Sequence, residues 1–204
     1  GMTMTGLVGK FAHLVNDLTG ALQFPTLLVT ACLTIVLGLG MPTPSAYILS
    51  AALMTPILTE IGVPTLPSHM FVFYYAVMSA ITPPVAVAAY AASSIAEDNP
   101  LLIAVSAVKF ALAAFIVPFA FIYGPELLMI GPWYSILFSF FTAAIGIVII
   151  ASALEAFLKK PLNRWERGLL FILGLGLVMP NVIISLTCLI ISLVYFGRAL
   201  ILKN

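Results

Sequence analysis

The sequence predicts an all-α integral membrane protein with a re-entrant helical hairpin, a discontinuous helix and further transmembrane helices towards its C-terminus. Hydrophobic residues make up 63% of its 204 residues and charged residues only 7%, whereas soluble domains average about 45–50% and about 25%. Several apolar stretches reach the length that a spanning helix needs, about 20 residues. Two of these stretches carry clustered helix-breaking residues near their middle, which marks them as interrupted helices.

Charge and cysteine content exclude several classes of function. The net charge of +1 gives no sign of a nucleic-acid partner. Cys32 and Cys188 lie inside apolar runs, so we expect two small buried side chains rather than a disulfide or a metal site. The first residues lack a basic segment followed by a cleavage site. We therefore expect no removable signal peptide, and the chain reads as beginning within a longer protein.

The first interrupted stretch follows an amphipathic lead-in over residues 1–21. It covers residues 22–58 and contains the breakers Gly38-Leu39-Gly40-Met41-Pro42-Thr43-Pro44. Proline removes a backbone donor and disfavours helix at the preceding residue, and glycine permits a tight turn. The pattern predicts a hairpin with a helix over 22–40, a turn, and a half-helix over 45–58.

The second interrupted stretch covers residues 70–96 and contains Thr82-Pro83-Pro84. It predicts two half-helices, 70–81 and 85–96. Carbonyl groups released at the end of the first carry partial negative charge, and N–H groups at the start of the second carry partial positive charge. Such breaks can bind a cation and an anion at membrane depth without a formal charge in the membrane.

Polar residues beside the breaks are candidate helix caps. We expect Ser45 to cap the half-helix after the hairpin turn, or Thr43 with Pro44 at the first helical position. Thr82 is placed as the cap of the half-helix after the second break. His69, at the end of the polar turn 59–69, is expected to cap the helix that follows rather than to relay protons.

The remaining stretches predict ordinary spans. Residues 102–123 and 134–154 are uninterrupted, apart from Pro118, which we interpret as a kink. Residues 168–201 contain Pro180-Asn181 at their middle. This stretch is either two short helices that turn back there or one long kinked helix, and we favour two helices.

The basic loop 158–167 sets the predicted orientation. It holds four of the eight Lys and Arg residues, and positive charge near span ends favours the cytoplasm. Counting back along the chain puts Trp133 outside and the turn at Glu97-Asp98 inside.

The broken stretches resemble a known family. GLGMPTPSAYILSAALMTPILTEIGVP, HMFVFYYAVMSAITPPVAVAAYAASSIA and FIYGPELLMIG are similar to the C-terminal half of the large membrane subunit of TRAP transporters (tripartite ATP-independent periplasmic transporters), with the fused TAXI-type permeases as the nearest likeness. By this resemblance, residues 1–131 form the second repeat of an elevator-type transport domain. Residues 132–204 correspond to a C-terminal transmembrane extension.

The resemblance implies a sodium-coupled secondary transporter. Such proteins import small organic acids across the bacterial inner membrane, where they are multi-pass proteins, and a periplasmic substrate-binding protein delivers the substrate. The family has two inverted repeats, each with a hairpin and a broken helix. The first repeat and the small-subunit segment are missing from this chain, so we expect them as partners, together with the lipid bilayer.

The family's motifs also imply site residues. The implied sodium site contains residues of the hairpin turn and of the second break: Gly38, Gly40, Met41, Pro42, Thr43, Ser79, Ile81, Thr82, Pro83 and Pro84. The expected substrate contacts are side chains beside the two breaks: Thr43, Ser45, Tyr47 and Thr82. Carbonyl and hydroxyl oxygens suit a hard cation such as sodium. Apart from sodium as the coupling ion, no cofactor is expected.

Other functions are less favoured. The chain lacks the HExxH, GxSxG and GxxxxGK[ST] patterns of metalloproteases, serine hydrolases and P-loop ATPases, so it is not expected to be an enzyme. An intramembrane enzyme would need an ionisable pair at membrane depth, and we find none in the sequence. The main alternative is a membrane scaffold or assembly subunit without a substrate site, which sodium-dependent stabilisation would distinguish from a transporter.

Overall fold

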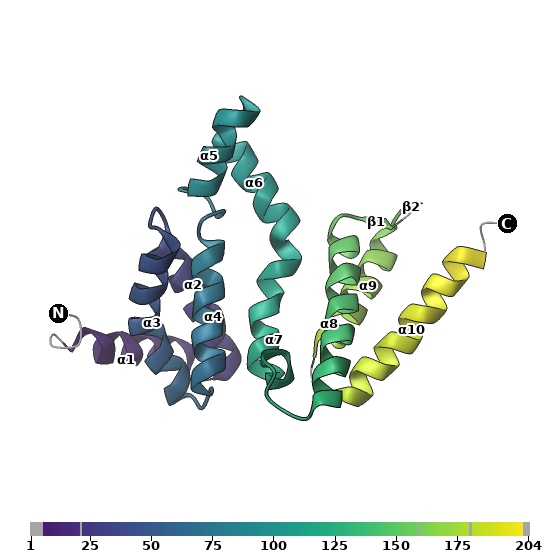
Figure 1. The fold of residues 1–204 in the computed structure, drawn as a ribbon, viewed down its shortest axis with the longest axis horizontal. Helices are drawn as coiled ribbons and strands as arrows, with labels where there is room; N and C mark the ends of the chain where they lie inside the picture. Colours follow the sequence, from purple (N-terminus) through teal and green to yellow (C-terminus); the bar gives the residue numbers. More distant parts are fainter. Residues whose placement is uncertain (1–5, 21, 159, 180, 202–204) are drawn as a thin grey trace. The chain divides into compact units, whose positions relative to one another are not determined.

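The computed structural model describes residues 6–20, 22–158, 160–179 and 181–201. Helices account for most of these residues, which confirms the predicted all-α class (Figure 1). Strands among them are confined to a short antiparallel pair, β1 Phe157–Leu158 and β2 Lys160–Pro161. In chain order, the α-helices and 3-10 segments are α1 Leu7–Thr19, α2 Gln23–Gly38, α3 Thr43–Glu60, α4 Thr65–Met78, α5 Val87–Ala96, α6 Pro100–Ala111, η1 Leu112–Ile116, α7 Val117–Tyr123, η2 Pro125–Leu128, α8 Trp133–Leu154, α9 Arg164–Val178 and α10 Val182–Ile201.

The chain divides into two compact units, Gly1–Ala111 and Leu112–Asn204. Within the described residues, two helical stretches, Pro100–Tyr123 and Trp133–Leu154, are long and apolar enough to cross a membrane. They coincide with the two uninterrupted spans predicted from the sequence. The predicted repeat boundary at residue 131, the orientation and the number of passes stay predictions.

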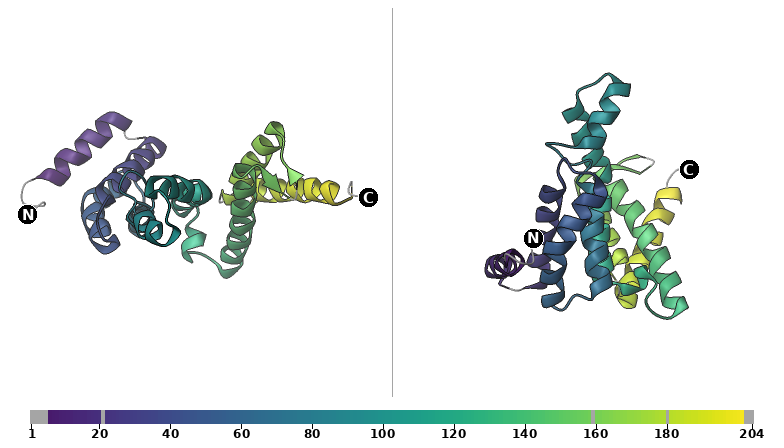
Figure 2. Two further views of the ribbon diagram at one scale, coloured as in Figure 1. Left: turned by 90° about the horizontal axis from the view of Figure 1, so that it is seen from above. Right: turned by 60° about the vertical axis from the view of Figure 1, so that its left-hand side comes forward.

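Three helices form the centre of the first unit. α2, α3 and α4 lie side by side (Figures 1 and 2), and each contributes a fully buried side chain, namely Leu27, Ile57 and Phe71. The chain reverses between α2 and α3, so the predicted hairpin is present, while its entry into a membrane from one side stays a prediction. α1 packs against both hairpin helices.

The expected caps of α3 and α4 are wrong. Thr43 is the first residue of α3 and Pro42 precedes it, with no side-chain hydrogen bond at the cap. Ser45 therefore lies within the first turn of the helix. His69 lies inside α4, which starts after Pro64. A proline occupies the N-cap position of both helices, so neither has a polar side chain there to accept from the first amides.

A long unwound stretch separates α4 from α5. α4 ends at Met78 and α5 begins at Val87, so the predicted break is confirmed but is longer than the three residues Thr82-Pro83-Pro84. Tight turns lengthen it, because the amides of Ala80 and Ile81 each donate to a carbonyl three residues earlier. α5 then pairs with α6 through buried alanines.

Glycines bring α8 and α9 together in the second unit. A Cβ on Gly174 would lie 2.5 Å from Ile150 Cγ1 and 2.9 Å from the carbonyl oxygen of Gly146. A Cβ on Gly146 would in turn lie 2.8 Å from the carbonyl oxygen of Gly174. Small residues allow such close backbone approach between membrane helices. Apolar clusters that include Ile149, Leu170 and Leu177 fill the space beside this contact.

α9 and α10 are separate helices, as favoured from the sequence. α9 begins with a capping box, in which the amide of Asn163 donates to Glu166 Oε2 over 2.8 Å. Asn181 Oδ1 accepts from the amides of Ile183 and Ile184 at the start of α10. Pro180 itself lies outside the described residues.

Two smaller predictions have different outcomes. Pro118 follows the 3-10 segment η1, which agrees with a local distortion of the helix at a proline.

Cys32 and Cys188 are free thiols, but Cys32 is exposed and Cys188 half-buried, so the expectation of full burial is wrong. An apolar run does not reveal which face of the helix meets its neighbours, and Cys32 lies on an outer face of α2.

Candidate functional site

The turn of the hairpin lies against the break between α4 and α5. Gly38, at the end of α2, approaches Ser79 so closely that a Cβ on Gly38 would overlap the Ser79 hydroxyl and lie 2.8 Å from its Cβ. A Cβ on Gly40 would lie 3.4 Å from Val85 Cγ1. The structure thus brings together two interruptions that are far apart in the sequence, and both contain predicted site residues.

Backbone oxygens are left free in the hairpin turn. Gly40 has φ +76°, a left-handed conformation that favours glycine. Within the described residues, no hydrogen bond ends on the carbonyl oxygens of Leu39, Gly40 or Met41. Pro42 differs, because its carbonyl accepts from the amide of Ala46 over 3.0 Å. The turn therefore offers oxygen ligands from the residues that precede α3.

The facing break offers oxygens as well. In the described part of the chain, the carbonyl oxygens of Ile81, Pro83 and Pro84 accept no hydrogen bond. Thr82 Oγ1 donates to the carbonyl of Met78 over 2.8 Å, so Thr82 closes the end of α4 and its predicted role as cap of α5 is wrong. Its hydroxyl oxygen retains lone pairs that can accept or coordinate.

The two helix starts near the site differ in their amides. At the start of α3, the amides of Thr43 and Ser45 donate no hydrogen bond within the described residues. At the start of α5, the amide of Ala88 donates to the carbonyl of Ala80 over 3.0 Å. The free amides expected after the second break are thus partly paired, because the unwound stretch folds back to cap α5. The start of α3 is the better place for an anion.

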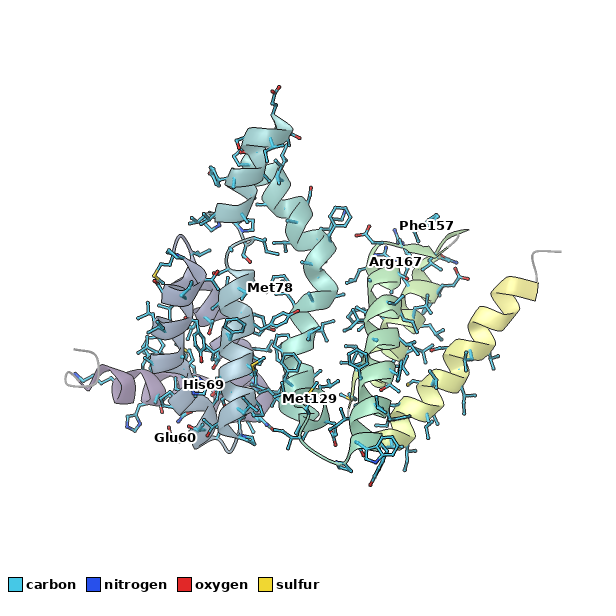
Figure 3. The ribbon with its side chains drawn as sticks, in the orientation of Figure 1. Glu60, His69, Met78, Met129, Phe157 and Arg167 are labelled. Atoms are coloured by element: carbon cyan, nitrogen blue, oxygen red, sulfur yellow. The ribbon has the colours of Figure 1, made fainter. Side chains whose placement is uncertain are left out.

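Tyr47 points along α4 instead of towards the break. Its hydroxyl is 2.9 Å from His69 Nδ1, and its ring lies edge-on to Phe73 at a centroid distance of 5.4 Å. His69 is more than two helical turns from Met78, the last residue of α4 (Figure 3). In this arrangement the hydroxyl of Tyr47 is occupied by an imidazole rather than directed at the two breaks.

Sequence reasoning missed a group of buried hydroxyls inside the hairpin. Thr30, Thr34 and Ser50 are completely buried and Thr55 is 6% exposed. None of their hydroxyl oxygens has a hydrogen-bond partner within the described residues. Thr34 and Ser50 each lie one helical turn deeper than the contact between Gly38 and Ala46. The spacing Thr26, Thr30, Thr34 along one face of an apolar helix was the available signal.

The free groups at the two breaks are uncharged oxygen atoms. The described residues contain no cluster of three or more His, Cys, Asp or Glu side chains. The free carbonyls of Gly40 and Ile81, and the buried hydroxyls one helical turn deeper in the hairpin, supply oxygen ligands without formal charge. Oxygen-only sites of this kind suit hard cations.

Broken helices whose free backbone groups meet inside apolar segments are typical of secondary membrane transporters. Residues 1–136 match the family model "Tripartite ATP-independent periplasmic transporter, DctM component". The match covers more than half of the chain, and the chain therefore belongs to this family. The resemblance seen in the sequence is confirmed, and the family is one of transporter components rather than enzymes. Comparisons with curated proteins and with solved structures gave no significant match.

Proposed function

We propose that this chain forms part of the transport site of a sodium-coupled permease that imports small organic acids. The observation that carries the proposal is the contact between Gly38 and Ser79, which sets the hairpin turn against the break in the next helix. A scaffold subunit gains nothing from free backbone oxygens at such a contact, because unpaired polar groups in a membrane cost several kcal/mol each, roughly.

The proposed sodium ligands are oxygens of the two breaks. On the hairpin side they come from Gly38, Gly40, Met41, Pro42 and Thr43. Among these, the carbonyls of Gly40 and Met41 accept no hydrogen bond within the described residues. The proposed partners across the contact belong to the unwound stretch: Ser79, Ile81, Thr82, Pro83 and Pro84. Sodium, when bound, supplies a positive charge that lets an anion be held at this depth.

The proposed substrate contacts are at the start of α3. The unpaired amides of Thr43 and Ser45 point to a carboxylate, which helix N-termini bind favourably. Thr82 is the proposed contact from the facing break. Tyr47 can join them only if its hydroxyl leaves His69 Nδ1, which lies 2.9 Å away, so we propose that its contact depends on a rotamer change.

The chain is proposed to act with other segments. We propose an elevator mechanism in which the hairpin is re-entrant, residues 1–131 form the second repeat, and 132–204 form an added membrane region. A first repeat, a small-subunit segment and a periplasmic binding protein would complete the multi-pass transporter in the bacterial inner membrane.

Uptake by the assembled transporter in proteoliposomes tests the proposal. The binding protein and candidate carboxylates are supplied outside, with and without an inward sodium gradient. We expect uptake to require both sodium and the binding protein. Thr82→Ala should raise the sodium concentration needed for half-maximal uptake. Thr59→Ala is the matched control, because Thr59 makes the same kind of bond to its own helix, to the carbonyl of Thr55 over 3.1 Å.

One result would remove a residue from the proposed site, and a second would contradict the proposal as a whole. An unchanged sodium response in Thr82→Ala would remove this residue from the site. If no carboxylate is taken up and sodium also leaves the thermal stability of the protein unchanged, the breaks have no transport role. The scaffold function would then be favoured.

A further inference from the structure

The second unit contains a pocket that the proposed transport site does not use. Its volume is about 440 Å³, within the range of pockets for small organic ligands, about 300–1,000 Å³. η2, the first half of α8 and the turn between α9 and α10 surround it. Its polar and aromatic lining includes Glu126, Tyr134, Phe138, Ser139, Asn181 and Ser185.

A carboxyl side chain, Glu126, lines this pocket. Glu126 Oε2 is buried and has no hydrogen-bond partner within the described residues. The residues that line the pocket include no Lys or Arg. Arg167 lies near the opposite end of the unit, where it donates to the carbonyl of Ala153 over 3.0 Å. Figure 3 shows Arg167 and Phe157 together at that end, far from Met129, which follows η2.

Two hydroxyl groups in the wall are available as acceptors rather than as donors. Thr142 Oγ1 donates to the carbonyl of Phe138 over 3.0 Å, and Ser185 Oγ to that of Met179 over 2.9 Å. The proton of each hydroxyl is already donated to a backbone carbonyl, so the hydroxyl oxygen can only accept a hydrogen bond from a ligand. With the Glu126 carboxylate, these oxygens can accept hydrogen bonds from a ligand that carries an ammonium group.

The aromatic side chains narrow the ligand class further. The rings of Tyr134 and Phe138 line the pocket, and aromatic faces attract ammonium groups. Trp133, next to Tyr134, is 74% exposed, and exposed Trp and Tyr residues at a helix end mark the head-group level of a membrane. An inorganic ion would leave most of the volume empty, whereas an organic amine with an apolar part would fill it.

We propose that this pocket binds a primary ammonium group, with the Glu126 carboxylate accepting its hydrogen bonds and apolar walls holding the attached carbon chain. The ammonium group comes from the ethanolamine head group of a phospholipid or from a free amine. This inference is independent of the proposed transport site, since every lining residue belongs to the second unit.

Lipid binding to the full chain, measured by native mass spectrometry, tests the inference. The purified protein is titrated in detergent with phosphatidylethanolamine and with phosphatidylglycerol of the same acyl chains. We expect phosphatidylethanolamine to bind at least tenfold more tightly. Glu126→Gln should weaken its binding about tenfold, which corresponds to about 1.4 kcal/mol. Glu155→Gln is the matched control, because this exposed carboxyl lies at the other end of α8 and should leave binding unchanged.

Free ethanolamine distinguishes the two sources. If it displaces the lipid at millimolar concentration, the site takes a free ammonium group; if it does not, the lipid head group is the ligand. Ser139→Leu, which fills the pocket without changing its charge, should abolish the preference for phosphatidylethanolamine and replaces Glu126→Gln as the test if that variant fails to fold. Equal binding of both lipids, or a preference that survives the folded Glu126→Gln or Ser139→Leu variant, would overturn the inference.

Discussion

The two units of the chain treat their buried hydroxyl groups differently. In the second unit, Thr142, Ser185 and Ser192 each donate to a backbone carbonyl. In the first unit, Thr34 and Ser50 are completely buried and have no partner within the described residues. A buried unpaired hydroxyl costs about 1–3 kcal/mol. The first unit therefore carries buried hydroxyl groups that its own packing does not pair, whereas the buried hydroxyls in the described part of the second unit are paired.

The two units also use close-packed glycines for different purposes. In the second unit, Gly146 and Gly174 face each other's carbonyls, so the contact joins two continuous helices. In the first unit, Gly38 contacts Ser79, the first residue of an unwound stretch. The comparison teaches that similar packing of small residues fixes a helix pair in one unit and aligns two backbone breaks in the other.

Gly38→Ala should have the largest effect on function. The added methyl group overlaps Ser79 and pushes the hairpin turn away from the break. A displacement of about 1 Å at a site can lower its activity roughly 100-fold, and we expect a loss of that size in sodium-dependent uptake. Gly9→Ala is the control, because a Cβ there meets nothing within 4 Å. Adding Ser79→Gly should restore part of the uptake, and a double variant as inactive as Gly38→Ala would contradict this explanation.

Gly174→Ala should mainly reduce stability. Its methyl group meets backbone atoms of α8, including Ile150 N at 3.2 Å, which cannot move aside as a side chain can. Overpacking of this kind costs about 1–3 kcal/mol. Thermal melting in detergent measures it, with Gly168→Ala as the control in open space. The sodium dependence of uptake should be unchanged in the protein that remains folded; a shift would show that the two units do not have separate roles.

Thr34→Val and Thr142→Val compare the two kinds of buried hydroxyl directly. Removing an unpaired hydroxyl removes its desolvation cost, so Thr34→Val should stabilise the sodium-free protein by about 1 kcal/mol. Thr142 Oγ1 donates to the carbonyl of Phe138 over 3.0 Å, so Thr142→Val loses a paired hydroxyl and should lower stability by about 1 kcal/mol. Thermal melting of both variants checks the difference. A loss of stability in Thr34→Val would mean that a water molecule or an ion already pairs with this hydroxyl.

Tyr47→Phe should have the smallest effect. The variant loses the contact with His69 Nδ1 but keeps the ring packing on Phe73, so we expect a loss of about 0.5 kcal/mol in stability. Uptake at saturating substrate should stay near normal if Tyr47 only supports α4. A rise in the substrate concentration for half-maximal uptake would instead confirm the predicted substrate contact.

Local sequence patterns predicted the interruptions well. Glycine and proline act on their own backbone, so the hairpin turn at Gly40 and the break at Pro83 could be located from the sequence. The caps could not, because a proline can start a helix without a polar side chain, as Pro42 and Pro64 do. Proline clusters also do not reveal how far the chain unwinds beside them.

The same local patterns could not predict contacts between residues that are far apart in the sequence. Nothing in the local sequence pairs Gly38 with Ser79, or Tyr47 with His69, because each pair depends on how three helices pack. The unpaired hydroxyls of Thr34 and Ser50 were missed for a related reason. A hydroxyl in an apolar helix usually bonds to its own backbone, and only the structure shows which ones do not.

One backbone hydrogen bond has a mechanical consequence. The amide of Ala88 donates to the carbonyl of Ala80 over 3.0 Å, which closes the unwound stretch into a ring between α4 and α5. α4 and α5 are thus connected both by the intervening chain and by this hydrogen bond. Separating α5 from the end of α4 must therefore break this hydrogen bond first.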